Sequence, residues 1–262
     1  MNALATQTLN TTTTPNGAIL ALKTPDEIIA VIAPEPKPTP TTIALKNIYS
    51  ITKTDTLPYI LKHMDVYEIN TKPRMAAFLA ACFVQSTGFR RGTEQFDITP
   101  CRLYKENDRV DTPALAHRLA RIGQQEVANF LHSFKDGNGG IDSNDGWNYR
   151  LRTPLQLRGR TIYQIIKDKS GIDCINEPEL LETDENGIIA AMAYWQASGY
   201  NTLADKLKFK NGFELETTYH KNTGNKNYRS SRAAVSIKKK LSGNTTQLLD
   251  FCEFIERGML YL

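Results

Sequence analysis

The feature that most constrains this chain is one helical run that begins at Thr71 and must stop by Gly88. Thr71 offers a hydroxyl that can cap a helix, and Pro73 stands in the first turn, where a helix tolerates proline. Apolar side chains then recur at intervals of three and four residues, which is the spacing of one buried helical face. They are Met75, Phe78, Leu79, Cys82 and Phe83. The run predicts a central buried helix that ends in a glycine turn.

Two polar residues flank the predicted end of this helix. Gln85 lies on its last turn and Glu94 lies just beyond the glycine. Cleavage of a glycosidic bond needs a pair of carboxyl groups at a site of this kind. In this chain the first of the two residues, Gln85, carries an amide instead of a carboxyl group, so any function in glycosidic-bond cleavage depends on that residue.

Composition excludes several classes of protein. The chain has 262 residues and a formal net charge of +4, which is too weak to indicate nucleic-acid binding but suits acidic polymers such as bacterial cell wall. No apolar run is long enough to span a membrane. The four cysteines show no CxxC spacing, so we expect no disulfide framework, no metal site and no cofactor.

Residues 1–42 are rich in threonine and proline and predict a flexible or loosely docked tail. A short strand or helix within residues 19–32 is an alternative, and attachment to a protein partner is a further one. The N-terminus lacks a basic region followed by an apolar one, which is the pattern of a secretory signal. We therefore expect synthesis in the cytoplasm and action at the bacterial wall only after release or delivery.

Residues 43–262 predict one mainly α domain, because apolar residues recur at helical spacing and strand alternation is nowhere sustained. The loop at 135–146 is rich in Gly, Asn and Asp, but it lacks the glutamate that closes an EF-hand. Helices are expected in short segments before Lys72, from 113 to 134, after Gly159, from 184 to 198 and from 248 to 260.

Three ordered segments resemble one family. Residues 74–98 read RMAAFLAACFVQSTGFRRGTEQFDI, and residues 144–163 read NDGWNYRLRTPLQLRGRTIY. The third segment is NEPELL at 176–181, followed by matches between Trp195 and Asp205. Together they resemble glycoside hydrolase family 19, the chitinases and phage endolysins with a lysozyme-like helical fold. The resemblance covers roughly residues 60 to 240.

The resemblance implies hydrolysis of β-1,4 bonds in chitin or peptidoglycan, with inversion. It places the general base at Glu94 and the general acid at Gln85. A histidine that precedes the acid falls at Val84, and the hydroxyl that helps to hold the water falls at Arg158. Glutamine has no useful proton to give, so the resemblance implies a cleft that binds glycan, peptidoglycan in preference to chitin, with impaired hydrolysis.

Other residues take roles from the same resemblance. Trp147 and Tyr149 would stack on sugar faces, and Gln156 and Asn222 would contact substrate. The family has glycines where this chain has Leu151 and Thr153. A guanidinium at Arg158 would lower the pKa of Glu94 and take the place of the water. The expected braces of the cleft, through buried ion pairs, are Arg150 and Arg160.

Several alternatives remain open at this point. Glu94 could form a structural salt bridge, Trp147 and Tyr149 could be core residues, and the four histidines could be surface or core residues without a function. Gln85 could be an engineered replacement of glutamate. The chain could also be an active muramidase or chitinase that uses Glu94 with a substituted acid, for which Asp97 is a candidate, or a scaffold or delivery protein that is no enzyme.

Overall fold

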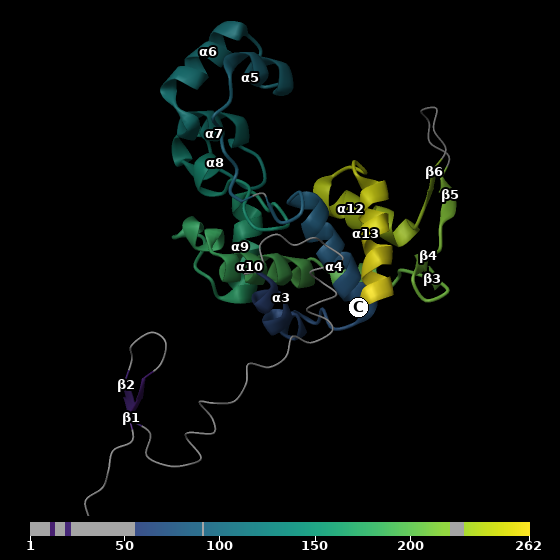
Figure 1. Cartoon of the computed structure of the whole chain (residues 1–262). Helices are drawn as coiled ribbons and strands as arrows, with labels where there is room; N and C mark the ends of the chain where they lie inside the picture. Colours follow the sequence, from purple (N-terminus) through teal and green to yellow (C-terminus); the bar gives the residue numbers. More distant parts are fainter. Residues whose placement is uncertain (1–10, 14–18, 22–55, 91, 221–227) are drawn as a thin grey trace, which may run out of the picture. The chain divides into compact units, whose positions relative to one another are not determined.

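The predicted central helix is α4 (Lys72–Gln85) in the computed structural model (Figure 1). The Thr71 hydroxyl accepts a hydrogen bond from the backbone N–H of Arg74, as a capping residue should. Every residue from 76 to 82 is at most 1 % exposed, so α4 is buried on all sides rather than on one face. Helix α13 (Leu248–Tyr261) packs along it.

The structure describes residues 11–13, 19–21, 56–90, 92–220 and 228–262. The chain divides into a unit of residues 1–39 and a unit of residues 40–262. In the first, β1 (Thr11–Thr13) pairs with β2 (Ile19–Ala21) in antiparallel register, so the strand alternative holds at the start of the 19–32 stretch. The rest of the predicted tail, and Asn222, lie outside the described residues.

The second unit is mainly helical, which confirms the predicted fold class. Around α4 and α13 lie further helices that share one hydrophobic core (Figure 1). They are α3 (Leu57–His63), η2 (Asp65–Tyr67), α9 (Arg160–Ser170), η4 (Pro178–Glu182), α10 (Asp184–Ala197), α11 (Tyr200–Ala204) and α12 (Arg232–Ser242). Among the described residues, no helix is both long and apolar enough to cross a membrane.

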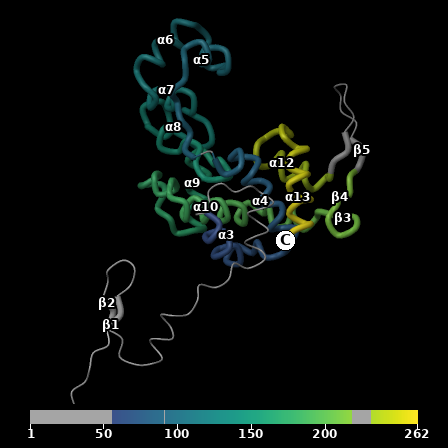
Figure 2. The backbone as a smooth tube through the Cα atoms, in the orientation of Figure 1, coloured from purple at the N-terminus to yellow at the C-terminus, as the bar shows by residue number. Residues whose placement is uncertain are grey.

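A second hydrophobic cluster joins the helices between residues 96 and 149. Here α5 (Pro100–Glu106), α6 (Pro113–Ile122), α7 (Gln124–His132) and α8 (Asp145–Asn148) pack in sequence, each on the next (Figure 2). The cluster includes Phe96, Leu103 and Val127. Phe96 belongs to this cluster and lies two residues after Glu94, so the cluster borders the segment that carries Glu94.

Strands are short in the described part of this unit. Hairpin β3 (Phe209–Lys210) and β4 (Glu214–Leu215) precedes hairpin β5 (Thr218–His220) and β6 (Tyr228–Ser230), and both are antiparallel.

Three helical boundaries differ from the predictions. The segment from 113 to 134 is two helices, because Gly123 at φ 131° breaks it between α6 and α7. Helix α5 was not predicted, although Thr99 caps it and Pro100 begins it. The loop at 135–146 holds η3 (Ile141–Ser143) and the start of α8. Short elements of this kind carry too little periodicity to be seen in the sequence.

Trp195 anchors the main core. Its ring stacks on Tyr200 with centroids 4.6 Å apart and meets Phe78 of α4 edge-on at 5.5 Å. Its indole N–H donates to Asn201 Oδ1 at 3.0 Å, and Asn201 Nδ2 donates to the carbonyl of Tyr67 at 2.9 Å. The Trp195 side chain therefore contacts residues of α4 and α11, and through Asn201 it is linked to η2.

We expect Trp195→Ala to lower the free energy of unfolding by about 3–5 kcal/mol, because it empties a fully buried aromatic site. Urea denaturation followed by circular dichroism measures the change. Leu249→Ala is the control, since Leu249 is a helical residue that is 68 % exposed, and its effect should stay within about 0.5 kcal/mol. An equal loss in both variants would contradict the role of Trp195.

Candidate functional site

The turn after α4 delivers the two residues singled out in the sequence. Ser86 caps the end of the helix, where its hydroxyl donates to the carbonyl of Cys82 and accepts the N–H of Phe89. Gly88 follows at φ 75°, a conformation that favours glycine. Gln85 therefore remains on the helix while the chain turns away toward Glu94.

Glu94 is fixed to the loop at Leu151 by two hydrogen bonds. Its backbone N–H donates to the carbonyl of Leu151 at 2.8 Å, and the N–H of Leu151 donates to Glu94 Oε2 at 3.1 Å. The Glu94 side chain is 21 % exposed, so solvent still reaches the carboxylate. This pairing joins two loops that are far apart in the sequence.

The carboxylate of Glu94 also has a histidine partner. His132 Nε2, at the end of α7, lies 3.4 Å from Glu94 Oε2. The imidazole is buried, packs edge-on against Phe96 at 5.5 Å, and neither ring nitrogen makes a hydrogen bond within the described residues. The sequence analysis assigned no function to this histidine, because nothing in its spacing links it to Glu94.

The surroundings favour the ionised form of Glu94. Burial is the strongest influence and raises the pKa of the Glu94 carboxyl. His132, the N–H of Leu151 and the charge of Arg158 together outweigh it, so the pKa lies below its ordinary value. The predicted lowering by Arg158 is confirmed in direction, but His132 contributes more.

Gln85 has a buried lysine as its neighbour. Lys238 of α12 is 3 % exposed, and its Nζ donates to Gln85 Oε1 at 3.3 Å. Burial lowers the pKa of Lys238, and the charge of Asp250 partly offsets this effect. The amide oxygen thus accepts a hydrogen bond in the place where the resemblance implies an acid.

Gln85 lines a cavity of about 440 Å³, which lies within the range of small-ligand sites. The cavity is open to solvent on one side and polar over much of its wall. Its other lining residues are Asp136, Leu151, Gln156, Leu157, Arg158, Ile162, Tyr194, Leu241, Ser242 and Gly243. Glu94 is not among the lining residues, and it adjoins this wall only through its hydrogen bonds with Leu151, which does line the cavity.

Gln156 and Arg158, two of the residues predicted to bind substrate, line this cavity. Gln156 Nε2 donates to the carbonyls of Gly92 and Thr153, which holds the 92–94 segment against the 151–157 loop. Arg158 Nε lies 3.2 Å from Asp136 Oδ2, so this guanidinium is paired at the cavity wall. Gly159 is needed beside this pair, because an added Cβ would lie 2.3 Å from Asp136 Cβ.

Three arginines brace the loop that carries Leu151. Arg150 and Arg152 both reach Glu182, and Arg152, which is 2 % exposed, also donates to the carbonyl of Asn148 and to Tyr163 Oη. Arg160 pairs with Asp145 at 3.1 Å. Ion pairs at Arg150 and Arg160 are therefore present, although the Arg160 side chain is half exposed.

The two aromatic residues proposed for sugar stacking are used differently. Tyr149 is 3 % exposed, its hydroxyl donates to the carbonyl of Ile175, and its ring packs on Tyr163. A stacking role for Tyr149 is therefore wrong, since no sugar face can reach a core ring. Trp147 is partly exposed, and the guanidinium of Arg150 covers one face of its ring at 3.9 Å.

Tyr194 is the aromatic residue that the sequence analysis missed. It is partly buried and lines the same cavity as Gln85. Its position on α10, one residue before the core Trp195, could have signalled an outward-facing ring, but not which cavity it would reach.

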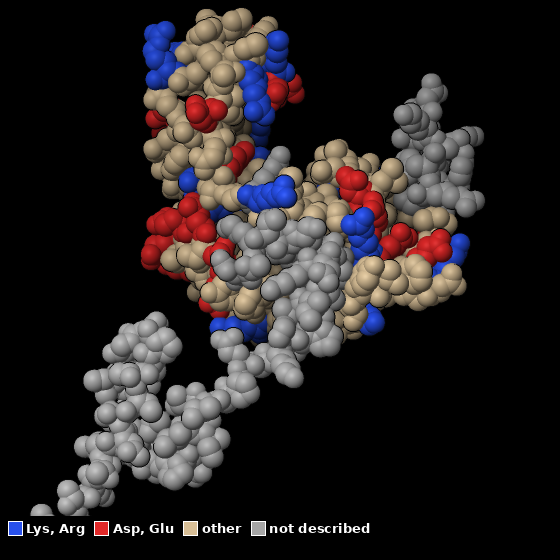
Figure 3. Space-filling view, in the orientation of Figure 1, with Lys and Arg blue, Asp and Glu red and all other residues tan. Residues whose placement is uncertain are grey.

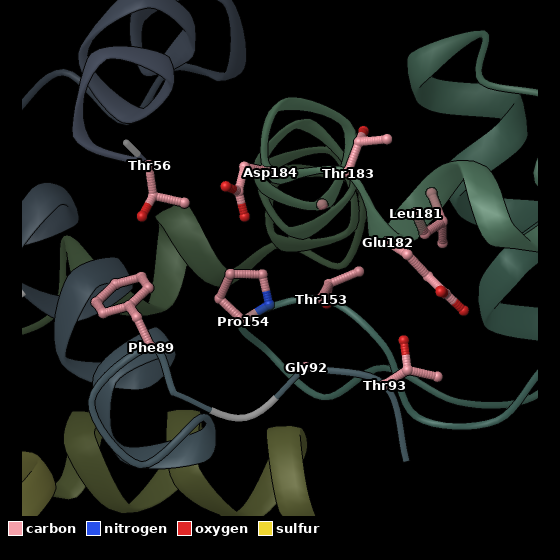
Figure 4. A pocket seen from close by; sticks show the side chains of 11 residues that line it. Thr56, Phe89, Gly92, Thr93, Thr153, Pro154, Leu181, Glu182, Thr183 and Asp184 are labelled. Atoms are coloured by element: carbon pink, nitrogen blue, oxygen red, sulfur yellow. The ribbon is translucent and has the colours of Figure 1, made fainter. Parts of the chain in front are cut away.

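A smaller cavity of about 70 Å³ lies behind the cleft loops (Figure 4). Phe89, Thr93 and Pro154 face Thr183 and Asp184 at the start of α10 across this space. The volume is far below that of a ligand site and suits a few water molecules. Among the described residues, no three His, Cys, Asp or Glu side chains gather as a metal site would require.

Comparison with known proteins gives a partial likeness to one family. The chain is 29 % identical over 126 residues to a glycosyl hydrolase family 19 domain-containing protein of Haemophilus influenzae, a match that covers 48 % of this chain and 62 % of that protein. No family model matches the chain. The chain resembles a glycosyl hydrolase family 19 domain. The predominantly helical fold is consistent with that likeness, which extends over about half of the sequence.

In this family 19-like domain, we expect His132→Gln to raise the pKa of Glu94, because burial of the carboxyl persists while its strongest stabilising partner is lost. In the unaltered protein the lowered pKa means that Glu94 stabilises the fold above its unfolded pKa, near 4.3, and that this contribution is lost as pH falls through the folded value. Carbon-detected NMR titration of the Glu94 carboxyl measures the shift.

Glu94→Gln identifies the resonance in that titration. His132→Gln should also weaken the acid-side fall in stability. An unchanged pKa in His132→Gln would show that His132 does not act on Glu94.

Proposed function

We propose that this domain binds a β-1,4-linked, GlcNAc-containing glycan, peptidoglycan rather than chitin, and hydrolyses it slowly or not at all. The observation that carries the proposal is the Gln85 amide, which lies in the wall of a 440 Å³ cavity and accepts a hydrogen bond from Lys238. The ionised Glu94 carboxylate accepts a hydrogen bond from Leu151, which lines the same cavity. The related Haemophilus influenzae protein, which the match spans only in part, supports the class of polymer.

Impaired hydrolysis follows from the chemistry of the two side chains. An inverting mechanism needs one protonated carboxyl for the leaving oxygen and one ionised carboxylate for the water. Glu94 suits the second role, because its surroundings lower its pKa. Gln85 cannot fill the first role, and loss of a general acid typically costs about 10² to 10⁴ in rate.

Binding of a glycan does not require the proton that a general acid would donate. An amide is both a donor and an acceptor, so Gln85 and Gln156 can hydrogen-bond sugar hydroxyl and acetamido groups. Tyr194 and Ile162 add apolar surface to the same wall. This mixture of a few polar groups and apolar surface is typical of a small-molecule or oligosaccharide site.

An active enzyme with a substituted acid is the second candidate. Asp136 is the carboxylate that lines the cavity with Gln85, and its Oδ2 is already engaged with Arg158. Asp97 is exposed and, like Glu94, does not line the cavity. These positions favour binding over catalysis, and clearing of bacterial walls by the unaltered protein would reverse that preference.

We expect the unaltered protein to sediment with purified peptidoglycan and to leave its turbidity unchanged. Tyr194→Ala should weaken this binding roughly fivefold, because it removes one aromatic face from the cavity. Tyr104→Ala is the matched control, since Tyr104 lies on α5, is 44 % exposed and does not line the cavity. Absence of any glycan binding would favour a scaffold or delivery protein.

We also expect the double variant Gln85→Glu, Arg158→Ser to gain lytic activity, because it restores a proton donor and frees the water position that the resemblance implies. Activity should be highest at acid pH, since the Lys238 ammonium lies beside position 85 and favours an ionised glutamate there. A turbidity assay across pH measures the gain. Adding Glu94→Gln should abolish it, and lysis that survives this third change would contradict the role of Glu94.

A further inference from the structure

A second, strongly basic cavity lies at the beginning of α12. Its volume is about 570 Å³, and four of its lining residues are the exposed cations Lys206, Lys208, Lys210 and Arg232. Glu216 is the carboxylate in the same lining. On the face drawn in Figure 3, acidic side chains gather beside α9 and α10, and others lie near α13 and the β3–β4 hairpin with basic side chains among them.

The four cations are available for a ligand. None of them makes an ion pair with a residue that the structure describes, and this includes Glu216 in the same lining. By contrast, the arginines around Glu94 are paired with Glu182, Asp136 or Asp145. Exposed cations gathered around one cavity raise the positive potential there, which favours an anionic ligand.

The start of α12 adds to the positive potential. This helix has 11 residues, and Ser231 at its cap makes no side-chain hydrogen bond to the first turn. No acidic residue lies in that turn. The free N–H groups and the helix dipole therefore also favour an anion beside Arg232.

Helix α12 connects this cavity to the one at Gln85. Ser231 and Arg232 at its beginning line the basic cavity, and Leu241 and Ser242 at its end line the glycan cavity. With a rise of 1.5 Å per residue, the two ends are about 15 Å apart. The α12 residues that line the two cavities lie on different faces of the helix, so a single polymer that enters both must pass around α12.

We propose that the basic cavity binds the carboxylate groups of the peptide branches on the same peptidoglycan strand whose sugars enter the Gln85 cavity. The inference rests on the proposed function and deepens it. Chitin carries no such branches, so this cavity determines the preference for peptidoglycan. The ligand chemistry is that of an acidic peptide, since three lysines and one arginine outnumber the single Glu216.

The experiment compares binding of the full chain to intact sacculi free of phosphate polymers, to the same glycan after an amidase has removed the peptides, and to the released peptides. The test variant is Lys206→Gln, Lys208→Gln, Arg232→Gln. The control variant Lys105→Gln, Arg121→Gln, Lys169→Gln removes three exposed cations elsewhere and gives the same net charge.

We expect the test variant to bind intact sacculi and released peptides roughly tenfold more weakly, with a reduced dependence on salt. The control variant should bind both as the unaltered protein does, and all three proteins should bind peptide-free glycan equally. Equal binding of test and control variants to intact sacculi would overturn the inference. So would binding of the unaltered protein only to sacculi that retain phosphate polymers, which would assign the cavity to phosphate.

The two proposals fail in different ways. If peptide-free glycan is not bound by any variant while released peptides still distinguish test from control, the glycan proposal fails and the peptide site stands. If glycan is bound and Tyr194→Ala weakens it, but released peptides bind none of the proteins, the peptide site fails alone.

Discussion

The two hydrogen bonds between Glu94 and Leu151 are the constraint on which the candidate site depends. They hold the segment that follows α4 and its glycine turn against the loop at Leu151, which comes from a different part of the chain. Each side has its own support: the Ser86 cap on the first, and the ion pairs of Arg150 and Arg152 with Glu182 on the second. The carboxylate is therefore held in place by backbone atoms rather than by a flexible salt bridge.

The charges that surround this anchored loop explain what chemistry the site can support. His132, Arg158 and Lys238 supply positive or potentially positive groups near Glu94 and Gln85. Such an arrangement stabilises an ionised carboxylate and opposes a protonated one. It is suited to a general base and unsuited to a general acid, so the amide at position 85 agrees with its environment. For the function proposed above, the amide at position 85 and the electrostatics of its neighbours therefore point to the same outcome.

Local signals in the sequence predicted several helices that combine a capping residue or glycine boundary with a long run of apolar residues at helical spacing. Thr71, Pro73 and the spacing of apolar residues were sufficient for α4, and Gly159 correctly marked the residue before α9. Local signals at the Thr99 cap of α5 and at Gly123 were not recognised, whereas the side-chain contacts that the sequence did not predict join distant segments. Burial of Tyr149, the approach of His132 to Glu94 and the hydrogen bond from Lys238 to Gln85 arise from packing of α7, α9 and α12, which no local pattern encodes.

The loop after Leu151 departs from the pattern that the resemblance implies, as position 85 does. Thr153 adopts φ 67°, a conformation that costs a β-branched residue strain and costs glycine none, and its buried hydroxyl has no hydrogen-bond partner in the described part of the chain. The resemblance implies glycine there and at 151. Leu151 now adds a side chain to the wall of the Gln85 cavity, where glycine would leave room. Thr153 lies in the same loop but does not line this cavity. A wall narrowed by Leu151 would hinder a reaction that must fit a water and a distorted sugar together, whereas a site that only binds can tolerate it.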